Sequence, residues 1–434
     1  MPSEVHIFSL APFLVLLGLI AIMPLTGSRL WGNIFVKFAF SGILSLPVLV
    51  YLYLEGYLDV VFNHLLFDYI PFIILLGSLY IISGGIFIST PRSGKPHVNT
   101  IFLVTGAILA SIIGTTGASM LLIRPLIRSN EPRKNKTHII VFFIAVVANT
   151  GGLLTPLGDP ALFILYLRGV PFEWFAQLLP EWGLINFLLI GLFYLIDRKS
   201  YLKENNGKLP IKPYSGFHFK MQGTLNMLWL AGIIAAISLI NEKNIPSLET
   251  YPFLKYSREF IVVLMAMLSF AFTKKSNFKN NEFSWSPILE VAALFLGIFV
   301  TMTPALLYVE QHAYVFRIDS PGVVFFSTGF LSSILDNAPT AAVFHTLVTS
   351  AFADQVLIPG TGYGEVLNSL IKAIAVGAVA FGSMTYIGNG PNFMVKAIAE
   401  SNGVAMPSFF GYIFRYSLIY FLPVYILVYV ILLR

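Results

Sequence analysis

The chain has 434 residues, of which 56% are hydrophobic and only 11% are charged, and its mean hydropathy is +0.79. Because soluble domains carry about 25% charged residues, this composition indicates a polytopic membrane protein. The net charge of +6 does not indicate nucleic-acid binding, since the basic residues lie mostly in short loops between apolar runs. The chain has no cysteine, which excludes disulfides, thiolate metal sites and cysteine catalysis.

Ten apolar segments are each close to the length that a helix needs to cross a bilayer, about 20 residues. The first has Glu4 and His6 ahead of it and no basic region or cleavage site, so we interpret it as a retained crossing and not as a signal peptide. The ten segments cover residues 7–25, 34–54, 70–90, 137–167, 174–196, 224–240, 259–273, 288–308, 370–398 and 411–433.

Two further apolar blocks, residues 100–127 and 322–350, are interrupted near their middles by polar motifs. The first motif is Gly114-Thr115-Thr116-Gly117 and the second is Asp336-Asn337-Ala338-Pro339. We predict that both blocks are re-entrant hairpins, which enter and leave the membrane on the same side. The long polar segment 197–223 then divides the chain into a first half, 1–196, and a second half, 224–434, each with five crossings and one hairpin.

Charge sets the expected orientation, because cytoplasmic loops collect Lys and Arg. The segments on either side of the first hairpin are basic, whereas the loops 55–69 and 351–368 contain no Lys or Arg. This pattern predicts that both termini lie outside and that the first hairpin enters from the cytoplasm. It also assigns Lys37 and Arg124 to the cytoplasmic side, and we expect Glu290 to lie at the membrane interface.

The crossings 137–167 and 370–398 are each broken by glycine and proline. The first contains the run ANTGGLLTPLGDPALF at 148–163, and the second contains GSMTYIGNGPNFMVK at 382–396. Unwound backbone at membrane depth is tolerated only where protein or a water-filled cavity satisfies it. Asp159 adds a carboxylate, which costs about 2.5–3.5 kcal/mol at the bilayer centre and usually marks an ion pathway. One broken helix in each half predicts a transporter built from two inverted repeats.

With these motifs, the chain resembles the ion transporter superfamily, which includes sodium-coupled dicarboxylate carriers, citrate carriers, arsenite permeases and NhaD-type sodium:proton antiporters. The resemblance covers essentially the whole chain. It rests on the two hairpin tips, Thr115-Thr116-Gly117 and Asp336-Asn337-Ala338, and on the two breaks, Gly158-Asp159-Pro160 and Gly388-Asn389-Gly390-Pro391. It implies a homodimeric elevator with sodium held between tip and break. In the dicarboxylate carriers the tips read Ser-Asn-Thr and hold the substrate carboxylates, and both tips here differ from that signature.

The polar residues of the tips and breaks are the candidate ion and substrate ligands, because broken-helix transporters bind ions with backbone and side-chain oxygens. In the first half they are Thr115, Thr116, Ser119, Asn149, Thr150, Thr155 and Asp159, and in the second half Asp336, Asn337, Thr340, Ser383, Thr385, Asn389 and Asn392. We expect sodium at Thr155, Asp159, Asp336, Asn337 and Asn389, and no other cofactor. Asp159 and Asp336 can alternatively serve as N-caps of the helices that follow them.

Two carboxylates in a low dielectric repel an anionic substrate and attract a cation. Burial also favours the protonated carboxylate, so a proton and a sodium ion would compete for it. The leading hypothesis is therefore a sodium:proton antiporter of the bacterial inner membrane. The alternatives are a sodium- or proton-coupled carrier of a citrate-like carboxylate, an arsenite-type permease and an intramembrane enzyme. No HExxH, GxSxG or phosphate-binding GxxxxGK[ST] motif supports an enzyme or a nucleotide-driven pump.

Overall fold

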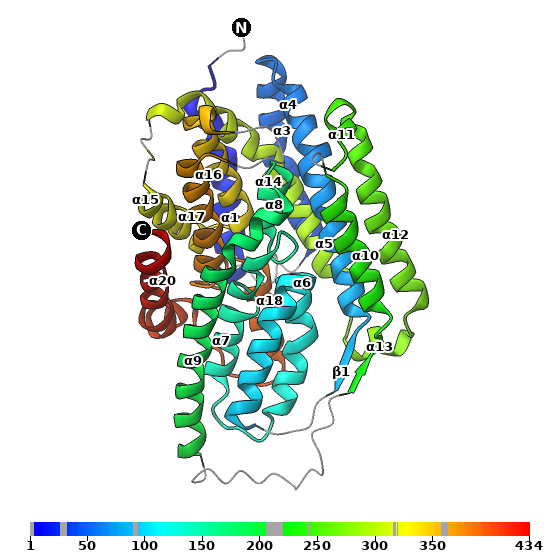
Figure 1. Cartoon of the computed structure of the whole chain (residues 1–434), viewed down its shortest axis with the longest axis vertical. Coiled ribbons are helices and arrows are strands. Elements are labelled where there is room, and N and C mark those ends of the chain that lie inside the picture. Colours follow the sequence, from blue (N-terminus) through cyan, green and yellow to red (C-terminus); the bar gives the residue numbers. More distant parts are fainter. Residues whose placement is uncertain are drawn as a thin grey trace.

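The computed structural model describes residues 4–26, 33–89, 94–204, 220–241, 244–315, 318, 320–356 and 363–434. Within them the protein is a bundle of helices with one small sheet (Figure 1). Among the described residues, eight helices are long and apolar enough to cross a membrane: Ile34–Leu54, Leu58–Gly84, Pro96–Ser129, Thr137–Leu154, Phe172–Lys203, Ser286–Val315, Glu365–Gly382 and Phe409–Leu433. The predicted all-α polytopic membrane fold is confirmed. Most of the predicted linker, residues 205–219, lies outside the described residues.

Each half of the chain contains both short and long helices. The helices of the first half are α1 (Ala11–Thr26), α3 (Ile34–Leu54), α4 (Leu58–Asn63), the π-helix η2 (His64–Tyr69), α5 (Ile70–Gly84), α6 (Pro96–Ser129), α7 (Thr137–Val146), the 3-10 helix η3 (Thr150–Leu154), α8 (Pro160–Leu167) and α9 (Leu179–Lys203). Those of the second half are α10 (Asn226–Leu239), α11 (Ser247–Thr250), α12 (Tyr256–Phe272), α13 (Lys275–Asn280), α14 (Ser286–His312), α15 (Pro321–Ile334), α16 (Asn337–Ala351), α17 (Glu365–Gly382), α18 (Gly390–Ser401), α19 (Phe409–Tyr412), the π-helix η9 (Ile413–Phe421), α20 (Leu422–Val428) and the π-helix η10 (Tyr429–Leu433).

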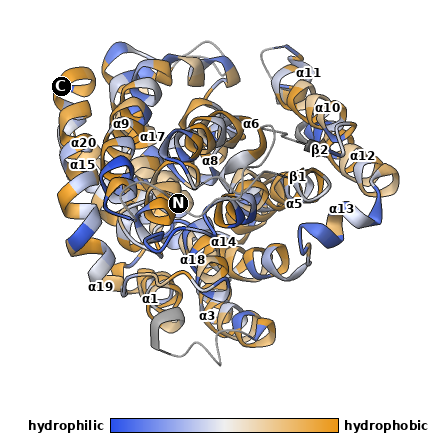
Figure 2. Cartoon of the chain, turned by 90° about the horizontal axis from the view of Figure 1, so that it is seen from below, coloured by the Kyte–Doolittle hydropathy of each residue, from blue (hydrophilic) through white to orange (hydrophobic). Residues whose placement is uncertain are grey.

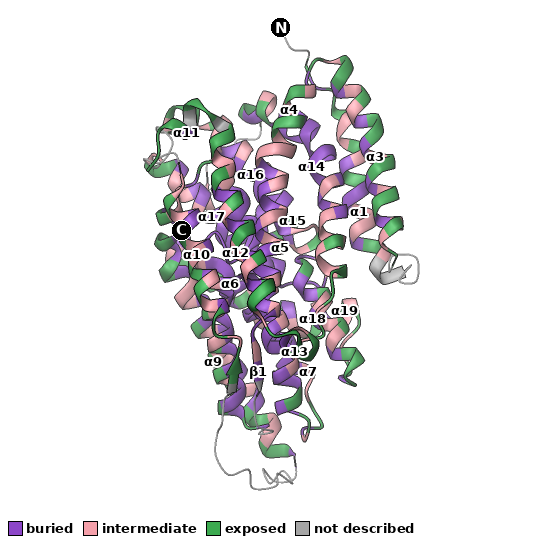
Figure 3. Cartoon of the chain, turned by 90° about the vertical axis from the view of Figure 1, so that its right-hand side faces the viewer, coloured by how far each residue is buried: buried purple, intermediate pink, exposed green. Residues whose placement is uncertain are grey.

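The outer helices expose large apolar side chains all around the bundle. Phe35 of α3, Phe187 of α9, Phe260 of α12 and Phe414 of η9 are all exposed, and Figure 2 shows hydrophobic ribbon at the rim. Buried residues concentrate in the middle of the molecule (Figure 3). A soluble monomer exposes few contiguous apolar patches, so this distribution matches a surface that faces lipid.

The α-helical structure stops in the two crossings where the sequence predicts breaks. Helix α7 ends at Val146 and α8 begins at Pro160, with only the short η3 between them, while α17 ends at Gly382 and α18 begins at Gly390. A proline stands at the start of α8 and of α18, where its missing N–H removes no helical hydrogen bond. Proline therefore starts the second helix of each pair at a fixed point.

Helix α6 folds back on itself at Gly114, which has φ +79° and ψ 153°. Glycine adopts this left-handed backbone without the steric penalty that a side chain brings. The amides of Asn99 and Asn130 exchange hydrogen bonds of 3.0 and 2.6 Å. These residues are 31 positions apart, so a straight helix would separate them by about 46 Å. The predicted block 100–127 is therefore a helical hairpin with its tip at Gly114.

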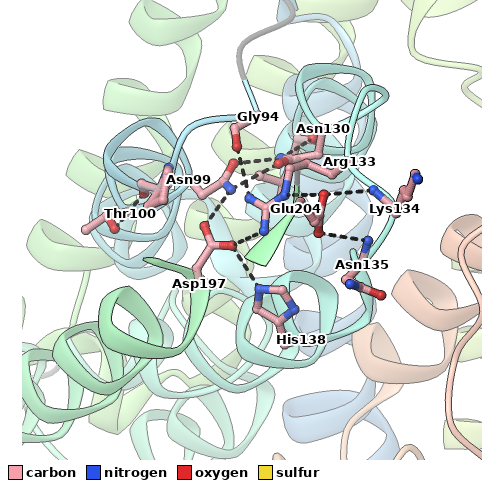
Figure 4. Close-up of polar contacts among 12 residues, drawn as sticks. Gly94, Asn99, Thr100, Asn130, Arg133, Lys134, Asn135, His138, Asp197 and Glu204 are labelled. Carbon is pink, nitrogen blue, oxygen red and sulfur yellow. Dashed lines mark hydrogen bonds and ion pairs between the residues drawn. The ribbon is translucent and has the colours of Figure 1, made fainter. Parts of the chain in front are cut away.

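A buried polar cluster ties the base of this hairpin to its neighbours (Figure 4). Asp197 of α9 accepts hydrogen bonds from Asn99 of α6 at 2.8 Å and from His138 of α7 at 2.8 Å. It also forms an ion pair of 2.9 Å with Arg133, which lies 3.3 Å from Glu204. The cluster thereby joins both arms of the hairpin, α7 and α9 into one unit.

The second hairpin consists of α15 and α16, which pack against each other. The chain is extended at Leu335 and Asp336 between them. The sheet joins the first half to the end of the linker, where β1 (Phe87–Ser89) pairs antiparallel with β2 (Lys220–Gln222) in the register Ile88 to Met221. The end of α5 is thus linked to the start of α10.

Candidate functional site

Asp159 lies at the start of α8 and is only 1% exposed. Its Oδ1 accepts a hydrogen bond from the backbone N–H of Ala161 at 3.0 Å, which makes it the N-cap of α8. The same Oδ1 accepts from Nδ2 of Asn337 at 2.7 Å, and Oδ2 accepts from Nδ2 of Asn389 at 3.1 Å. Asp159 therefore does more than cap α8, because its carboxylate also accepts hydrogen bonds from one amide of the second hairpin and one amide of the second break.

An asparagine network joins the two breaks. The amide of Asn389 also donates to the carbonyl of Ala148 at 3.0 Å. The amide of Asn149 donates to Oδ1 of Asn392 at 2.7 Å. The amide of Asn392 in turn donates to the carbonyl of Gly382 at 2.7 Å. The structure therefore gathers four predicted site residues, Asn149, Asp159, Asn389 and Asn392, around the point where both helices are interrupted.

Thr155 and Thr385 make matching contacts in the two halves. The hydroxyl of Thr155 donates to the carbonyl of Ser111 in the first hairpin. The hydroxyl of Thr385 donates to the carbonyl of Ser333 in the second hairpin, at 2.6 Å. Each predicted threonine thus ties its break to a hairpin.

Close backbone approach explains two glycines of the breaks. A Cβ at Gly158 would lie 2.1 Å from the carbonyl oxygen of Gly152, and a Cβ at Gly388 would lie 2.7 Å from that of Gly382. Both distances are shorter than real Cβ contacts. A side chain at these positions would force the unwound segments apart.

Three buried side-chain oxygens of the two hairpins have no hydrogen-bond partner among the described residues. They are Oγ1 of Thr115, Oγ of Ser119 and Oδ1 of Asn337. Leaving such a group unsatisfied costs about 1–3 kcal/mol. The backbone N–H of Thr115 donates to the carbonyl of Gly158 at 2.8 Å, so the first hairpin tip lies against the first break. These oxygens, together with the Asp159 carboxylate, offer the hard ligands that an alkali cation prefers.

A cavity of about 360 Å³ opens beside this site. One wall carries Thr116, Pro160, Asp336 and Asn389, from the tips and breaks, and the other wall is formed by α1, α3, α5 and α14. Asp336 accepts a hydrogen bond from the N–H of Ala338 at 3.1 Å, so it caps α16 as the alternative interpretation held. The backbone carbonyl of Asp336 accepts from the hydroxyl of Thr340 at 3.0 Å.

The cavity also contains an ion pair that was not predicted from the sequence. Nζ of Lys37 lies 2.5 Å from Oε2 of Glu290, and both residues line the wall opposite Asp336. Lys37 is only 4% exposed, although its charge was counted with the cytoplasmic loops. The sequence feature that could have indicated this pair is a lysine and a glutamate, each inside an otherwise apolar segment. Arg124, by contrast, pairs with Glu282 at 2.9 Å at the surface.

Two predicted site residues turn away from the network. The hydroxyl of Thr150 donates to Oδ1 of Asn186 in α9 at 2.8 Å. The hydroxyl of Ser383 shares a hydrogen bond of 2.6 Å with the hydroxyl of Tyr425 in α20. These contacts attach the breaks to the surrounding helices, and the structure therefore gives both residues a supporting role.

Comparison with known proteins agrees with this architecture. No curated protein matches the chain. A family model, CitMHS_2, described as "Putative citrate transport", matches residues 2–433. Because this match covers nearly the whole chain, the protein belongs to the CitMHS_2 family of transporters, within the ion transporter superfamily.

Proposed function

We propose that the protein is a sodium-coupled secondary transporter of a small carboxylate such as citrate. The observation that carries the proposal is the buried Asp159 carboxylate, which accepts hydrogen bonds from Asn337 and Asn389, together with hairpin oxygens that have no described hydrogen-bond partner. The family description supplies the substrate class. Sodium is the coupling ion and is transported with the substrate.

Electrostatics provides the coupling. Asp336 lines the cavity, and the buried Asp159 accepts a hydrogen bond from Asn389, which also lines it, so an anion entering alone is repelled by nearby carboxylates in a low dielectric. A cation bound at Asp159 removes most of that repulsion. The substrate therefore binds after sodium, and its uptake depends on the sodium gradient.

The cavity is large enough for a small substrate. Its volume of about 360 Å³ lies at the lower end of the range for ligand pockets, about 300–1,000 Å³. Most of its lining is apolar, and Thr116 contributes a hydroxyl. That hydroxyl can donate to a carboxylate oxygen, and Lys37 can do so when the substrate replaces its ion-pair partner Glu290.

We further propose that the two halves are inverted repeats and that the protein works as an elevator within a homodimer. The matching contacts of Thr155 and Thr385 support the repeat. In this arrangement the hairpins and broken helices move together against α1, α3, α5 and α14, which form the opposite wall of the cavity. Both hairpins are then re-entrant and both termini lie outside.

Sodium:proton exchange is the second candidate function. It is favoured by Asp336, whose side chain lines the same cavity as Asn389 and has only the N–H of Ala338 as a described hydrogen-bond donor. A carboxylate in that position can bind a proton or share a cation. In this case no organic substrate would be carried.

Proteoliposomes containing the purified protein distinguish the two candidates. Labelled citrate uptake and internal pH are followed with and without an inward sodium gradient, for wild type, Asp159→Asn, Asp336→Asn and the exposed control Asp354→Asn. We expect sodium-dependent citrate uptake that Asp159→Asn abolishes and Asp354→Asn retains. Sodium-driven proton movement without citrate uptake would establish the exchanger instead, and the absence of both activities would overturn both assignments.

A further inference from the structure

A second cavity, of about 570 Å³, lies at the other end of α8. Asp159 precedes this helix and Arg168 follows it, so the two charged residues are separated by about 13 Å along the helix axis. The cavity shares no lining residue with the one beside Asp336. It is bounded by α8 and α16 on one side and by η2, α11 and α12 on the other.

Charges of both signs line the cavity. Arg168, Lys255 and Arg258 contribute three cationic groups and Asp68 and Glu173 two carboxylates, and Glu259, outside the lining, pairs with Arg258. Arg258 is occupied, because its Nε donates to Oε1 of the adjacent Glu259 at 2.8 Å and its Nη1 donates to the hydroxyl of Tyr166 at 3.0 Å. Arg168 is therefore the group whose contacts decide what the cavity can bind.

The guanidinium of Arg168 is only partly satisfied. Its Nη1 donates to Oγ1 of Thr346 at 2.7 Å. Its Nη2 lies 3.5 Å from Oδ2 of Asp68, which is longer than the 2.7–2.9 Å typical of a charged hydrogen bond. Its Nε is buried and has no partner among the described residues. A planar guanidinium with free donors is the group that binds carboxylates through two hydrogen bonds.

His345 adds a second unsatisfied nitrogen. Its Nε2 is buried without a described partner, and the residue lines the same cavity and is only 4% exposed. Thr346, the next residue of α16, already receives Arg168. Two buried nitrogen atoms of residues that line this cavity, Nε of Arg168 and Nε2 of His345, therefore have no hydrogen-bond partner among the described residues.

We infer that this cavity is a second binding site for the carboxylate substrate, centred on Arg168 and separate from the sodium site. The inference rests on the proposed function for the identity of the anion. The shared chemistry is that of any small oxyanion with several negative charges, and the family description favours a carboxylate over phosphate. The bound anion replaces Asp68 as the partner of Arg168, so it loosens the contact between the end of α8 and η2.

Equilibrium binding to the purified full-length protein tests this site. Citrate and inorganic phosphate are titrated separately by calorimetry in sodium-free buffer, where the site at Asp159 lacks its coupling ion. We expect Arg168→Gln to weaken citrate binding about 10- to 100-fold, as for the loss of one charged hydrogen bond. The citrate affinity of Arg168→Lys should lie between those of wild type and Arg168→Gln, because lysine keeps the positive charge but cannot donate two parallel hydrogen bonds as a guanidinium does. Asp68→Asn binds citrate more tightly, because it removes the competing carboxylate.

Arg415→Gln is the matched control, since Arg415 is an exposed arginine of η9 and its loss should leave citrate binding unchanged. Wild-type affinity in folded Arg168→Gln, or binding of phosphate and not of citrate, would overturn the inference. Failure of the proposed function has a different signature. In that case wild-type proteoliposomes take up no citrate, while the sodium-free binding and its loss in Arg168→Gln remain.

Discussion

Replacing Asp159 with asparagine tests the centre of the site with little risk to the fold. Asparagine caps helices about as well as aspartate, so α8 can still begin at Pro160. The amide oxygen can still accept from Ala161 and Asn337, but its NH₂ group then faces the donating NH₂ of Asn389, which now lies 3.1 Å from Oδ2. We expect a loss of stability of about 1–3 kcal/mol from that mismatch.

We expect the loss of sodium affinity to exceed this loss of stability. A unit negative charge attracts a monovalent cation about 4 Å away by about 4 kcal/mol at an effective dielectric constant of 20, which corresponds to nearly a thousandfold in affinity. Radioactive sodium binding to purified Asp159→Asn should therefore fall below detection, whereas Asp354→Asn binds as wild type does.

A role swap sharpens the test. In the double variant Asp159→Asn/Asn389→Asp, the amide and the carboxylate exchange positions and one negative charge returns, but the carbonyl of Ala148 and Oδ1 of Asn149 lose the amide that donates to them. We expect sodium binding to recover in part. Unchanged sodium affinity in folded Asp159→Asn would refute the assignment of the cation to this carboxylate.

Three further predictions concern the surrounding structure. Thr115→Val removes a hydroxyl that has no described partner, so sodium affinity should fall while stability in sodium-free buffer is unchanged or higher; wild-type sodium affinity would show that the hydroxyl is not a ligand. Asp197→Asn leaves Arg133 without its nearest carboxylate and should cost about 3–5 kcal/mol in denaturant unfolding, against at most about 0.5 kcal/mol for Glu400→Gln in an exposed helical pair; equal costs would contradict the role of burial. Gly158→Ala places a Cβ 2.1 Å from the Gly152 carbonyl oxygen and should yield no monodisperse protein by size-exclusion chromatography, whereas Gly191→Ala, with nothing within 4 Å, should behave as wild type.

Features that depend on local backbone chemistry could be predicted from the sequence. Proline is favoured in the first turn of a helix and disfavoured in its interior, so a helix start at Pro160 follows from the residue itself, although Pro47, Pro125 and Pro304 lie inside α3, α6 and α14. The reversal at Gly114 likewise depends on a backbone conformation that glycine favours. An aspartate next to such a break could be identified as a candidate site residue because an isolated carboxylate is expensive at membrane depth.

The partners of these residues were decided only by the tertiary structure. Asn337 and Asn389 are 178 and 230 positions from Asp159 in the chain, and no local pattern specifies that their amides meet on one carboxylate. Thr150 and Ser383 stand in the same breaks as their neighbours, yet they point toward α9 and α20 because the rotation of each unwound segment is set by packing. The same holds for Lys37 with Glu290 and for Arg168 with Thr346. Each of these contacts joins separate helices, so its geometry depends on how the helices pack and not on the spacing of residues within either one.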